Sequence, residues 1–580
     1  MKSSIHLTPA DYLVVGGYFV LIVAIGLWSR KAQATSTDYF AGGHQIPWWM
    51  AGISHYMSGF SAFAFVVYSQ MAYIYGWVAI TIFWTGVPAC LLGALVFARR
   101  WRRARVITPI EFLELRCNFK VRQLFVWAGI PTKLFDDALK IFATSLFLSV
   151  IAGLSFDVSI ALCGLIIVAY TVSGGLFALV VADYVQFLMK TIAILLLLPL
   201  AILKLGPLHQ ALHGIPPNLF RLTGGPYSWI YVIGYGAVVL VSYNGNWALA
   251  QKYYSVPDER SATKAAYLSA ALTFVGTPIM FLPAILARKF LPDLIARGRT
   301  EDTFVLLLVD LLPVGMIGIV VAAMFSATMA AVSSDLNVIA SVLTKDWYQR
   351  ILHPGASESR LLGVGRGFTL LLGVIITSLS LWLAHSHRQS LFQMMVSVFG
   401  VLVAPTVLPV LALLIWRSIS ARGVICGFSA GLATGIAATL FREFWLLPLH
   451  LSQRTLLQWE GVGILLNMAA TLFGMYAGSR IWPAVGEEKE RAQKFFERME
   501  IPVLRSESAD NPGMSRPSKI IGFATAMVGA LLVLAGLISG VRTARILDLA
   551  CGGILVLIGL VSLGLKNGRA ERTAPGSTNS

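Results

Sequence analysis

The sequence predicts an all-α, polytopic membrane protein, on the basis of its composition, the spacing of its apolar runs and their lack of strand-like alternation. Of the 580 residues, 57% are hydrophobic and 13% are charged, and the mean hydropathy is +0.74. A soluble domain could not bury so much apolar surface. Apolar runs of about 20 residues recur from Asp11 to Leu565 and give about fifteen spans. Barrel strands would alternate in polarity over about ten residues, so each run is expected to be a helix.

The first span is expected at residues 11–28. It follows Met1-Lys2-Ser3-Ser4 and has no convincing small-residue cleavage site, so a retained helix is favoured over a signal peptide. This helix and the loop after it form an N-terminal unit at residues 1–45.

Ten further spans fall into two sets of five. The first set covers residues 46–203, the second covers residues 227–416, and the polar stretch 204–226 links them. Because five is odd, the second set would be inverted in the membrane relative to the first, which is the topology of inverted-repeat transporters. The ten spans are expected at residues 46–75, 77–98, 121–150, 157–173, 176–203, 227–250, 264–288, 308–345, 365–385 and 389–416.

Four extra helices are predicted after this core, in an accessory unit at 417–480 and a C-terminal unit at 519–566. They are expected at residues 423–441, 457–480, 519–540 and 546–566.

The polar stretch 481–518 lies between these two units. Its segment 487–499 mixes acidic and basic residues, which predicts a short surface helix. A solvated cytoplasmic connector is favoured here, with a docking or regulatory element as the alternative. Residues 567–580 have the composition of a disordered tail.

The distribution of basic residues predicts the orientation. The net charge is +17, and most of the 45 Lys and Arg residues fall in loops that share one side of the membrane if the N-terminus is outside and the C-terminus is cytoplasmic. The dense cluster at residues 99–105 is expected to anchor that topology against anionic lipid. Membrane lipid is therefore an expected partner and nucleic acid is not. The predicted location is the cell inner membrane.

The sequence lacks the motifs of several function classes. The sequence has no P-loop, no HExxH and no Rossmann glycine pattern, and we find no clustered catalytic set at one depth. An enzyme, an ATP-driven pump and an organic cofactor are therefore not expected. The five cysteines form no CxxC and are expected to pack as small apolar side chains.

Two ionisable residues interrupt the span at 176–203. Asp183 and Lys190 lie seven residues apart among apolar neighbours. Charged side chains in a span usually face a water-filled path or a partner charge. This helix is therefore expected to border a functional path.

Five segments together resemble the sodium:solute symporter family, whose core is the LeuT-type five-plus-five inverted repeat. Their order along the chain matches the hydropathy pattern. The resemblance implies a secondary active transporter that carries a small organic solute with sodium by alternating access. The five segments are residues 38–49, 174–186, 251–253, 312–337 and 344–348.

The resemblance implies a first sodium site between the first and eighth core helices. The aligned carbonyls are those of Met57 and Phe60, and Ala327 is the aligned position on the eighth helix. The family usually places two hydroxyl residues where this chain has Ala330 and Ala331, so two of about five expected oxygens are absent.

A second sodium site is implied by Asp183, Ser333 and Ser334, which match positions used by some family members. Asp335 is an extra carboxylate that would add an oxygen if it faces the same cavity. Serines in a span also often bond only to their own helix, which is the alternative for this pair.

Lys190 suggests a second mode of coupling. With 1.5 Å of rise per residue, Lys190 and Ala330 lie at matching depths, about 21 and 22 Å from the inner ends of their helices. In distant relatives of this fold, the amino acid–polyamine–organocation group, a fifth-helix lysine occupies this site. Lys190 could then support proton-coupled or uncoupled transport. The competing interpretation pairs it with Asp136 or Asp137, or lets it snorkel along the helix.

The predicted solute site is only partly polar. Of the aligned positions, Ser61 and Asn246 are polar, so a sugar would leave many hydrogen bonds unmade. A small carboxylate or amino acid is favoured over a sugar. A transporter-derived solute sensor is the alternative from another class, and the pattern predicts no particular oligomeric state. The candidate substrate residues are Ser61, Ala64, Phe83, Asn246, Trp247, His55 and Tyr68.

Overall fold

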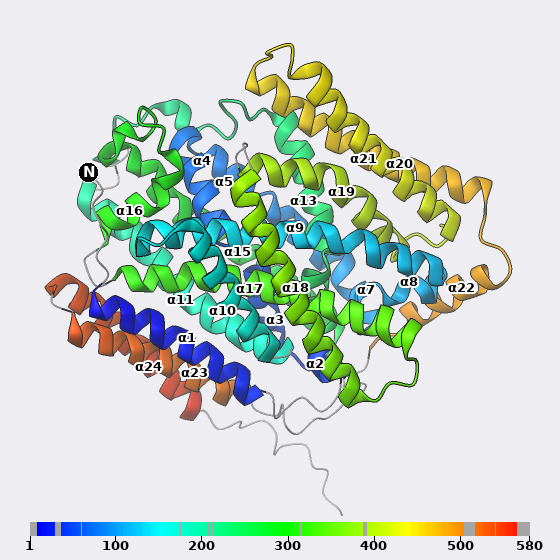
Figure 1. Ribbon diagram of the computed structural model, residues 1–580, viewed down its shortest axis with the longest axis horizontal. Helices are drawn as coiled ribbons and strands as arrows, with labels where there is room; N and C mark the ends of the chain where they lie inside the picture. The colour runs from blue at the N-terminus through cyan, green and yellow to red at the C-terminus, as the bar shows by residue number, and fades with distance from the viewer. Residues whose placement is uncertain are drawn as a thin grey trace, which may run out of the picture.

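The computed structural model is helical almost throughout (Figure 1), which confirms the predicted all-α class. Among the described residues it has no β-strand, only one isolated bridge between Gly224 and Tyr227. The predicted carbonyl ligand at Phe60, the Gly174-Gly175 pair and the tail 567–580 lie outside the described residues. The structure describes residues 8–29, 36–59, 61–173, 176–206, 209–210, 213–312, 316–386, 391–503, 517–539 and 541–564.

The N-terminal unit and the first five-helix set are built from eleven helices, several of them consecutive pieces of one predicted span. The first and second core helices are each broken into shorter pieces, whereas the next three are long. The helices are α1 (Pro9–Ser29), α2 (Ser36–Ala41), α3 (Trp48–Ser58), α4 (Ser69–Tyr75), α5 (Val78–Phe83), α6 (Gly86–Leu92), α7 (Ala98–Arg103), α8 (Glu111–Arg116), α9 (Phe119–Ala152), α10 (Phe156–Ser173) and α11 (Leu176–Leu205). Two π-helical turns, η3 (Ala64–Tyr68) and η4 (Gly93–Phe97), join α3 to α4 and α6 to α7.

The second set and the C-terminal helices follow the predicted order. The π-helical turn η8 (Leu343–Leu352) extends α17. The helices are α13 (Trp229–Gly245), α14 (Trp247–Tyr254), α15 (Glu259–Phe290), α16 (Thr303–Leu311), α17 (Ile317–Val342), α18 (Glu358–Ser386), α19 (Leu391–Leu413), α20 (Ala421–Phe441), α21 (Gln453–Ile481), α22 (Glu487–Glu500), α23 (Pro517–Ile538) and α24 (Arg542–Gly564).

The first helix of each set is interrupted near its middle. In the first set, α3 ends at Ser58 and the helix resumes after Ser61. In the second set, Asn246 has an extended ψ of 131° that separates α13 from α14. Broken helices at corresponding positions of two repeats expose backbone groups for binding in inverted-repeat transporters. The two breaks therefore mark the candidate site.

Helix α17 is the centre of the molecule, and its side chains are buried along its whole length. It packs against α11, α9, α3 and α18 (Figure 1). Its many Ala and Ser residues allow these helices to approach closely. At its start, Asp11 of α1 accepts a hydrogen bond of 2.7 Å from the Gly318 amide, so the N-terminal helix caps α17.

The described part of the chain contains nine helices long and apolar enough to cross a membrane, and four shorter apolar helices. This agrees with a multi-pass membrane protein. The accessory helices form two hairpins, α20 with α21 and α23 with α24, and α23 packs on α1 (Figure 1).

Helix α22 packs against α7 and α8, which differs from the solvated connector that the sequence predicts. The apolar face of α22 is buried, and its polar groups bind neighbouring segments. Arg103 donates to the Met499 carbonyl at 3.1 Å, and Arg417 pairs with Glu500 at 2.5 Å. The sequence showed the charges of this helix, but its partners come from distant segments. The buried side chains are Ala492, Phe495, Phe496 and Met499.

Candidate solute and ion sites

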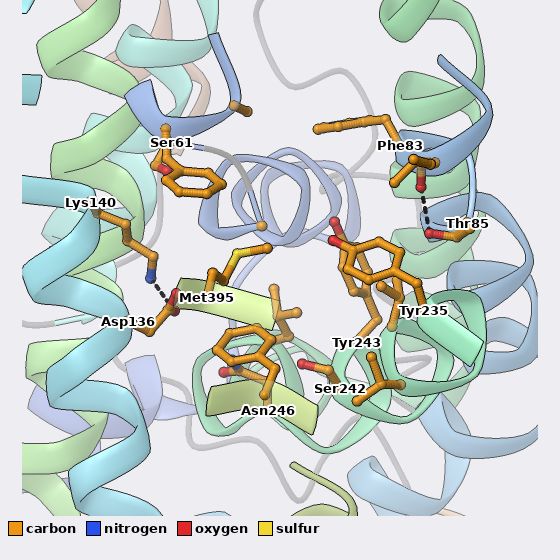
Figure 2. A pocket seen from close by; sticks show the side chains of 18 of the residues that line it. Ser61, Phe83, Thr85, Asp136, Lys140, Tyr235, Ser242, Tyr243, Asn246 and Met395 are labelled. Carbon is orange, nitrogen blue, oxygen red and sulfur yellow. Dashed lines mark hydrogen bonds and ion pairs between the residues drawn. The ribbon is translucent and has the colours of Figure 1, made fainter. Parts of the chain in front are cut away.

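A cavity of about 140 Å³ lies where the breaks in the two discontinuous helices face α9 (Figure 2). Five predicted substrate positions line this main cavity: Ser61, Ala64, Tyr68, Phe83 and Asn246. Side chains of α9, α13 and α19 complete its wall.

One side of the main cavity is charged and another is aromatic (Figure 2). On α9, Lys140 pairs with Asp136 at 2.8 Å, and both side chains line the cavity. In the aromatic part, the hydroxyls of Tyr68 and Tyr235 are 3.0 Å apart, and Tyr243 lies beside them. Such walls suit a small solute with a charged group and an apolar body.

The Asp136–Lys140 pair belongs to a larger buried charge network. Lys140 also pairs with Asp137 at 2.9 Å and with Asp335 at 3.1 Å. Lys133 pairs with the other oxygen of Asp335. Buried charges are costly unless they are paired in this way. Both oxygens of Asp335 are therefore bound by lysines, and its predicted ion-coupling role stays a prediction.

The first predicted ion position is lined by apolar side chains. Ala330 packs with Ile53, Tyr56 and Met57 in one cluster, and Ala331 is buried on the same helix, as is Ala327. Methyl groups therefore stand where the family resemblance implies hydroxyls, as the sequence indicated. The carbonyl of Met57 lies in the last turn of α3, next to the break.

A hydroxyl that the sequence analysis missed holds the α3 break. Thr328 of α17 accepts a hydrogen bond of 3.0 Å from the Ala62 amide, and its Oγ1 lies 2.6 Å from that of Thr144. Thr328 is only two residues from Ala330, but its partner was not readable from the resemblance.

The second predicted ion position is rich in oxygen. Asp183 accepts a hydrogen bond from Ser54 of α3 through one carboxylate oxygen. Its other oxygen, and the hydroxyl of Ser333, are buried and have no hydrogen-bond partner in the described part of the chain. Hard cations are bound by such oxygens. Helix α11, which carries Asp183, packs against α17, which carries Ser333.

Ser334 lies between two further polar groups. It accepts hydrogen bonds of 3.1 Å from Ser58 and 3.3 Å from Lys252. Lys252 is fully buried in α14 and also acts electrostatically on Asp183. In the sequence, Lys252 is notable only as part of the family segment 251–253, so this positive neighbour of the ion position was not predicted.

Lys190 lies at the boundary of the first ion position. Its ammonium nitrogen is 3.8 Å from the centroid of the Tyr56 ring, a cation–π contact. Tyr56 in turn packs in the apolar cluster with Ala330. Asp136 and Asp137, the alternative partners expected for Lys190, pair with Lys140.

Two predicted substrate residues do not line the main cavity. His55 stacks on Tyr253, with ring centroids 5.0 Å apart, and its Nδ1 lies 3.0 Å from the Ser269 hydroxyl. Trp247 lines a second cavity next to the main one.

One sequence signal could have revealed the charge network. Lys133, Asp136, Asp137 and Lys140 are spaced three, four and seven residues apart, so they share one face of α9. What the spacing could not show is the partner Asp335, about two hundred residues further along the chain.

A ten-helix core with two broken helices around a polar cavity defines a membrane secondary transporter. A model of the sodium:solute symporter family matches residues 39–431. The chain therefore belongs to this family, as the sequence analysis predicted. It is a sodium-coupled symporter of a small solute and not an enzyme.

Similar proteins agree with this assignment. The sodium/sialic acid symporter SiaT of Proteus mirabilis is 25% identical over 453 residues, which cover 75% of this chain and 89% of SiaT. The sodium/mannose cotransporter SLC5A10 of Bos taurus is also 25% identical, over 76% of this chain and 80% of the relative.

A solved structure supports the predicted LeuT-type fold. The outward-open, substrate-bound structure of a Na⁺-coupled sialic acid symporter superposes with a TM-score of 0.66 at 20% identity. The match covers 80% of this chain and 98% of that structure.

Proposed function

We propose that this protein imports a small amino acid or related carboxylate together with sodium. The observation that carries this proposal is the Asp136–Lys140 pair on the wall of the main cavity. A solute carboxylate would bind the Lys140 ammonium, and a solute ammonium would bind Asp136. Such charge-assisted bonds are stronger than bonds between neutral groups.

The rest of the cavity favours an apolar body over a sugar. Phe83, Met395 and Phe399 line it, and the Thr85 hydroxyl already donates to the Ile82 carbonyl at 2.7 Å. The Asn246 side-chain oxygen already accepts from Lys133 at 2.9 Å. These two groups are therefore not open to a ring of hydroxyls, and each unmade bond would cost free energy.

For sodium, we propose the position bordered by Asp183, Ser333 and Ser334. The open oxygens of Asp183 and Ser333 support it. The proposed ion position and the solute cavity both border α3 or the break that follows it. Ser54 and Ser58 face the ion position, and Ser61, just after the break, lines the cavity.

Coupling follows from this shared element. A bound ion stabilises one conformation of the α3 break, and this conformation forms the solute cavity, so the ion raises the affinity for the solute. The solute in turn raises the affinity for the ion by the same factor. Alternating access then moves both species together.

A second candidate is proton-coupled or uncoupled transport through Lys190. Its contact with Tyr56, which packs on Ala330, supports it. In that case the ammonium would occupy the edge of the first ion position. Lys190→Met would then change the sodium dependence and the pH profile of uptake, whereas with sodium at Asp183 both are expected to persist.

We also propose that the N-terminus is outside and the C-terminus cytoplasmic, in the cell inner membrane. The basic helix α7 and the charged helix α22 pack together, so both lie at one end of the bundle. A cytoplasmic position for this end agrees with the positive-inside rule.

Transport in proteoliposomes tests the solute and the ion. Sodium and proton gradients are imposed separately, and the solute panel holds amino acids, small carboxylates, sialic acid and glucose. We expect sodium-driven accumulation of an amino acid or carboxylate, reduced at least about tenfold by Lys140→Met, which removes the proposed cationic partner of the solute carboxylate. Because Lys140 also pairs with Asp136, Asp137 and Asp335, thermal unfolding of the variant is measured beside uptake. Lys204→Met, at a half-exposed pair with Asp310, is the matched control. Sodium-driven glucose uptake that Lys140→Met leaves unchanged would contradict the proposal.

A further inference from the structure

A second cavity adjoins the main one, and the two share part of their walls. Asp136, Ser242, Asn246 and Phe399 line both. The second cavity is enclosed by α9, α13, α14 and α19. On α9 the residues that line it run from Asp136 back to Phe125, near the N-terminal end of α9, which follows α8 in the chain.

On α9 and α19 the second cavity is displaced in the same direction. On α19 the main cavity ends at Phe399, whereas the second extends to Val407. Figure 1 shows α8 and α22 at the same end of the bundle as the start of α9. The second cavity therefore lies between the main cavity and that end.

Its lining carries the chemistry of a binding site. Lys133 is buried and pairs with Asp335. It also donates to Asn246 at 2.9 Å and lies 5.9 Å from the centroid of the Trp247 ring. The Thr132 side chain lines the cavity, is nine-tenths buried, and its hydroxyl has no hydrogen-bond partner in the described part of the chain. A buried hydroxyl without a partner is costly unless a ligand satisfies it.

Along α9, the two cavities are joined by alternating charges. Lys140 lines the main cavity, Lys133 lines the second, and Asp136 lines both. The two lysines are seven residues apart, which is about 10 Å along the helix. Asp136 therefore lies between the two lysines, three residues from Lys133 and four from Lys140.

We propose that the second cavity is a release-side station for the same solute, in which its carboxylate passes from Lys140 to Lys133 while Asp136 faces its ammonium throughout. This inference rests on the proposed function, because it takes the same amino acid or carboxylate. The Thr132 hydroxyl and the side-chain amide nitrogen of Asn246 then offer polar contacts at the station, and Trp247 packs on the apolar body.

Variants that alter only the second cavity test the proposal. Val407→Phe fills it, and Thr132→Val removes the open hydroxyl without changing the side-chain shape; neither residue lines the main cavity. The measurements are equilibrium binding of the radiolabelled solute in sodium and the rate of solute exchange in proteoliposomes. Phe83→Trp, which fills the main cavity, is the matched control.

We expect Val407→Phe to leave the Kd within about threefold of wild type and to slow exchange at least tenfold. Thr132→Val is expected to slow exchange about threefold, and Phe83→Trp to abolish binding. Wild-type exchange rates in both second-cavity variants would overturn the release station while leaving the proposed function intact. If the wild-type protein binds no amino acid or carboxylate of the panel, the proposed function itself fails.

If Val407→Phe does not fold, Thr132→Val gives the same test. Exchange slowed about threefold is expected, and exchange at the wild-type rate would overturn the release station.

Discussion

Asp183 and Asp335 are two buried carboxylates on packed helices, α11 and α17, yet their surroundings differ. Asp183 is 1% exposed and Asp335 is 2% exposed, so burial does not distinguish them. Asp335 is bound by two lysines of α9. Asp183 receives a hydrogen bond from Ser54, and its other oxygen has no hydrogen-bond partner among the described residues. The partners of a buried acid therefore decide whether it can bind a mobile cation.

The two environments also separate ion from solute. The lysines around Asp335 extend from its oxygens to the walls of both cavities. Ser54 of α3 donates to Asp183, and Ser58 at the end of α3 donates to Ser334 of α17. Replacing Asp183 should therefore impair sodium-driven uptake, whereas replacing Asp335 should lower stability.

The largest effect is expected for Asp183→Asn. The loss of a charged ligand should reduce sodium-driven uptake by more than about 100-fold, since charged hydrogen bonds contribute up to about 3 kcal/mol. The thermal unfolding midpoint in detergent should change little, because an amide still accepts the Ser54 hydrogen bond. Uptake is compared with that of Asp310→Asn, a half-exposed acid on α16. Uptake that remains near wild type would remove Asp183 from the ion path.

Asp335→Asn should instead affect stability. Without this carboxylate, two buried lysines lose a shared partner, and breaking a buried pair costs about 3 kcal/mol or more. Thermal unfolding in detergent measures the loss. The double variant Asp335→Asn with Lys133→Met should recover part of it, because the uncompensated charge is gone. A double variant as unstable as the sum of both single variants would argue against the pairing.

Ser333→Ala tests the hydroxyl that we propose as a sodium ligand together with Asp183. The sodium concentration for half-maximal uptake should rise about tenfold, which is about 1.4 kcal/mol of ion binding. Ser341→Ala is the control, since that hydroxyl already donates to the Val338 carbonyl on the same helix at 2.7 Å. Equal sodium dependence in both variants would place the ion elsewhere.

The smallest effect is expected at Glu114 of α8, an acid bound by cations as Asp335 is, but close to solvent. Burial alone would raise the pKa of Glu114, but hydrogen bonds from Arg350 at 2.5 Å and Arg122 at 2.6 Å outweigh it, and the pKa is lowered. Its stabilising effect is therefore present above the unfolded pKa of about 4.3 and is lost as the pH falls through the lower folded value.

Glu114→Gln should cost less than about 1 kcal/mol at pH 7, as partly exposed pairs do. Thermal unfolding at pH 7 and pH 4 provides the measurement. The difference between variant and wild type should shrink at pH 4, and a difference that grows there would contradict the assigned sign.

The sequence predicted the helices of the core and the two-set organisation well, because each depends on neighbouring residues. Apolar runs and their lengths are local properties. The pieces within spans were not predicted. The single span expected at 46–75 is interrupted after Ser58, since the backbone there faces the cavity and is held by Thr328 of another helix.

By itself, the sequence determined the membrane class, the family and the replacement of two hydroxyls by Ala330 and Ala331. Only the tertiary structure decided that Asp335 is bound by Lys133 and Lys140, and that α22 packs against α7 and α8. Composition and periodicity are carried by adjacent residues, whereas the partner of a buried charge depends on which distant helix lies beside it. That is why the sequence indicates Asp183 and Asp335 alike, and the structure separates them.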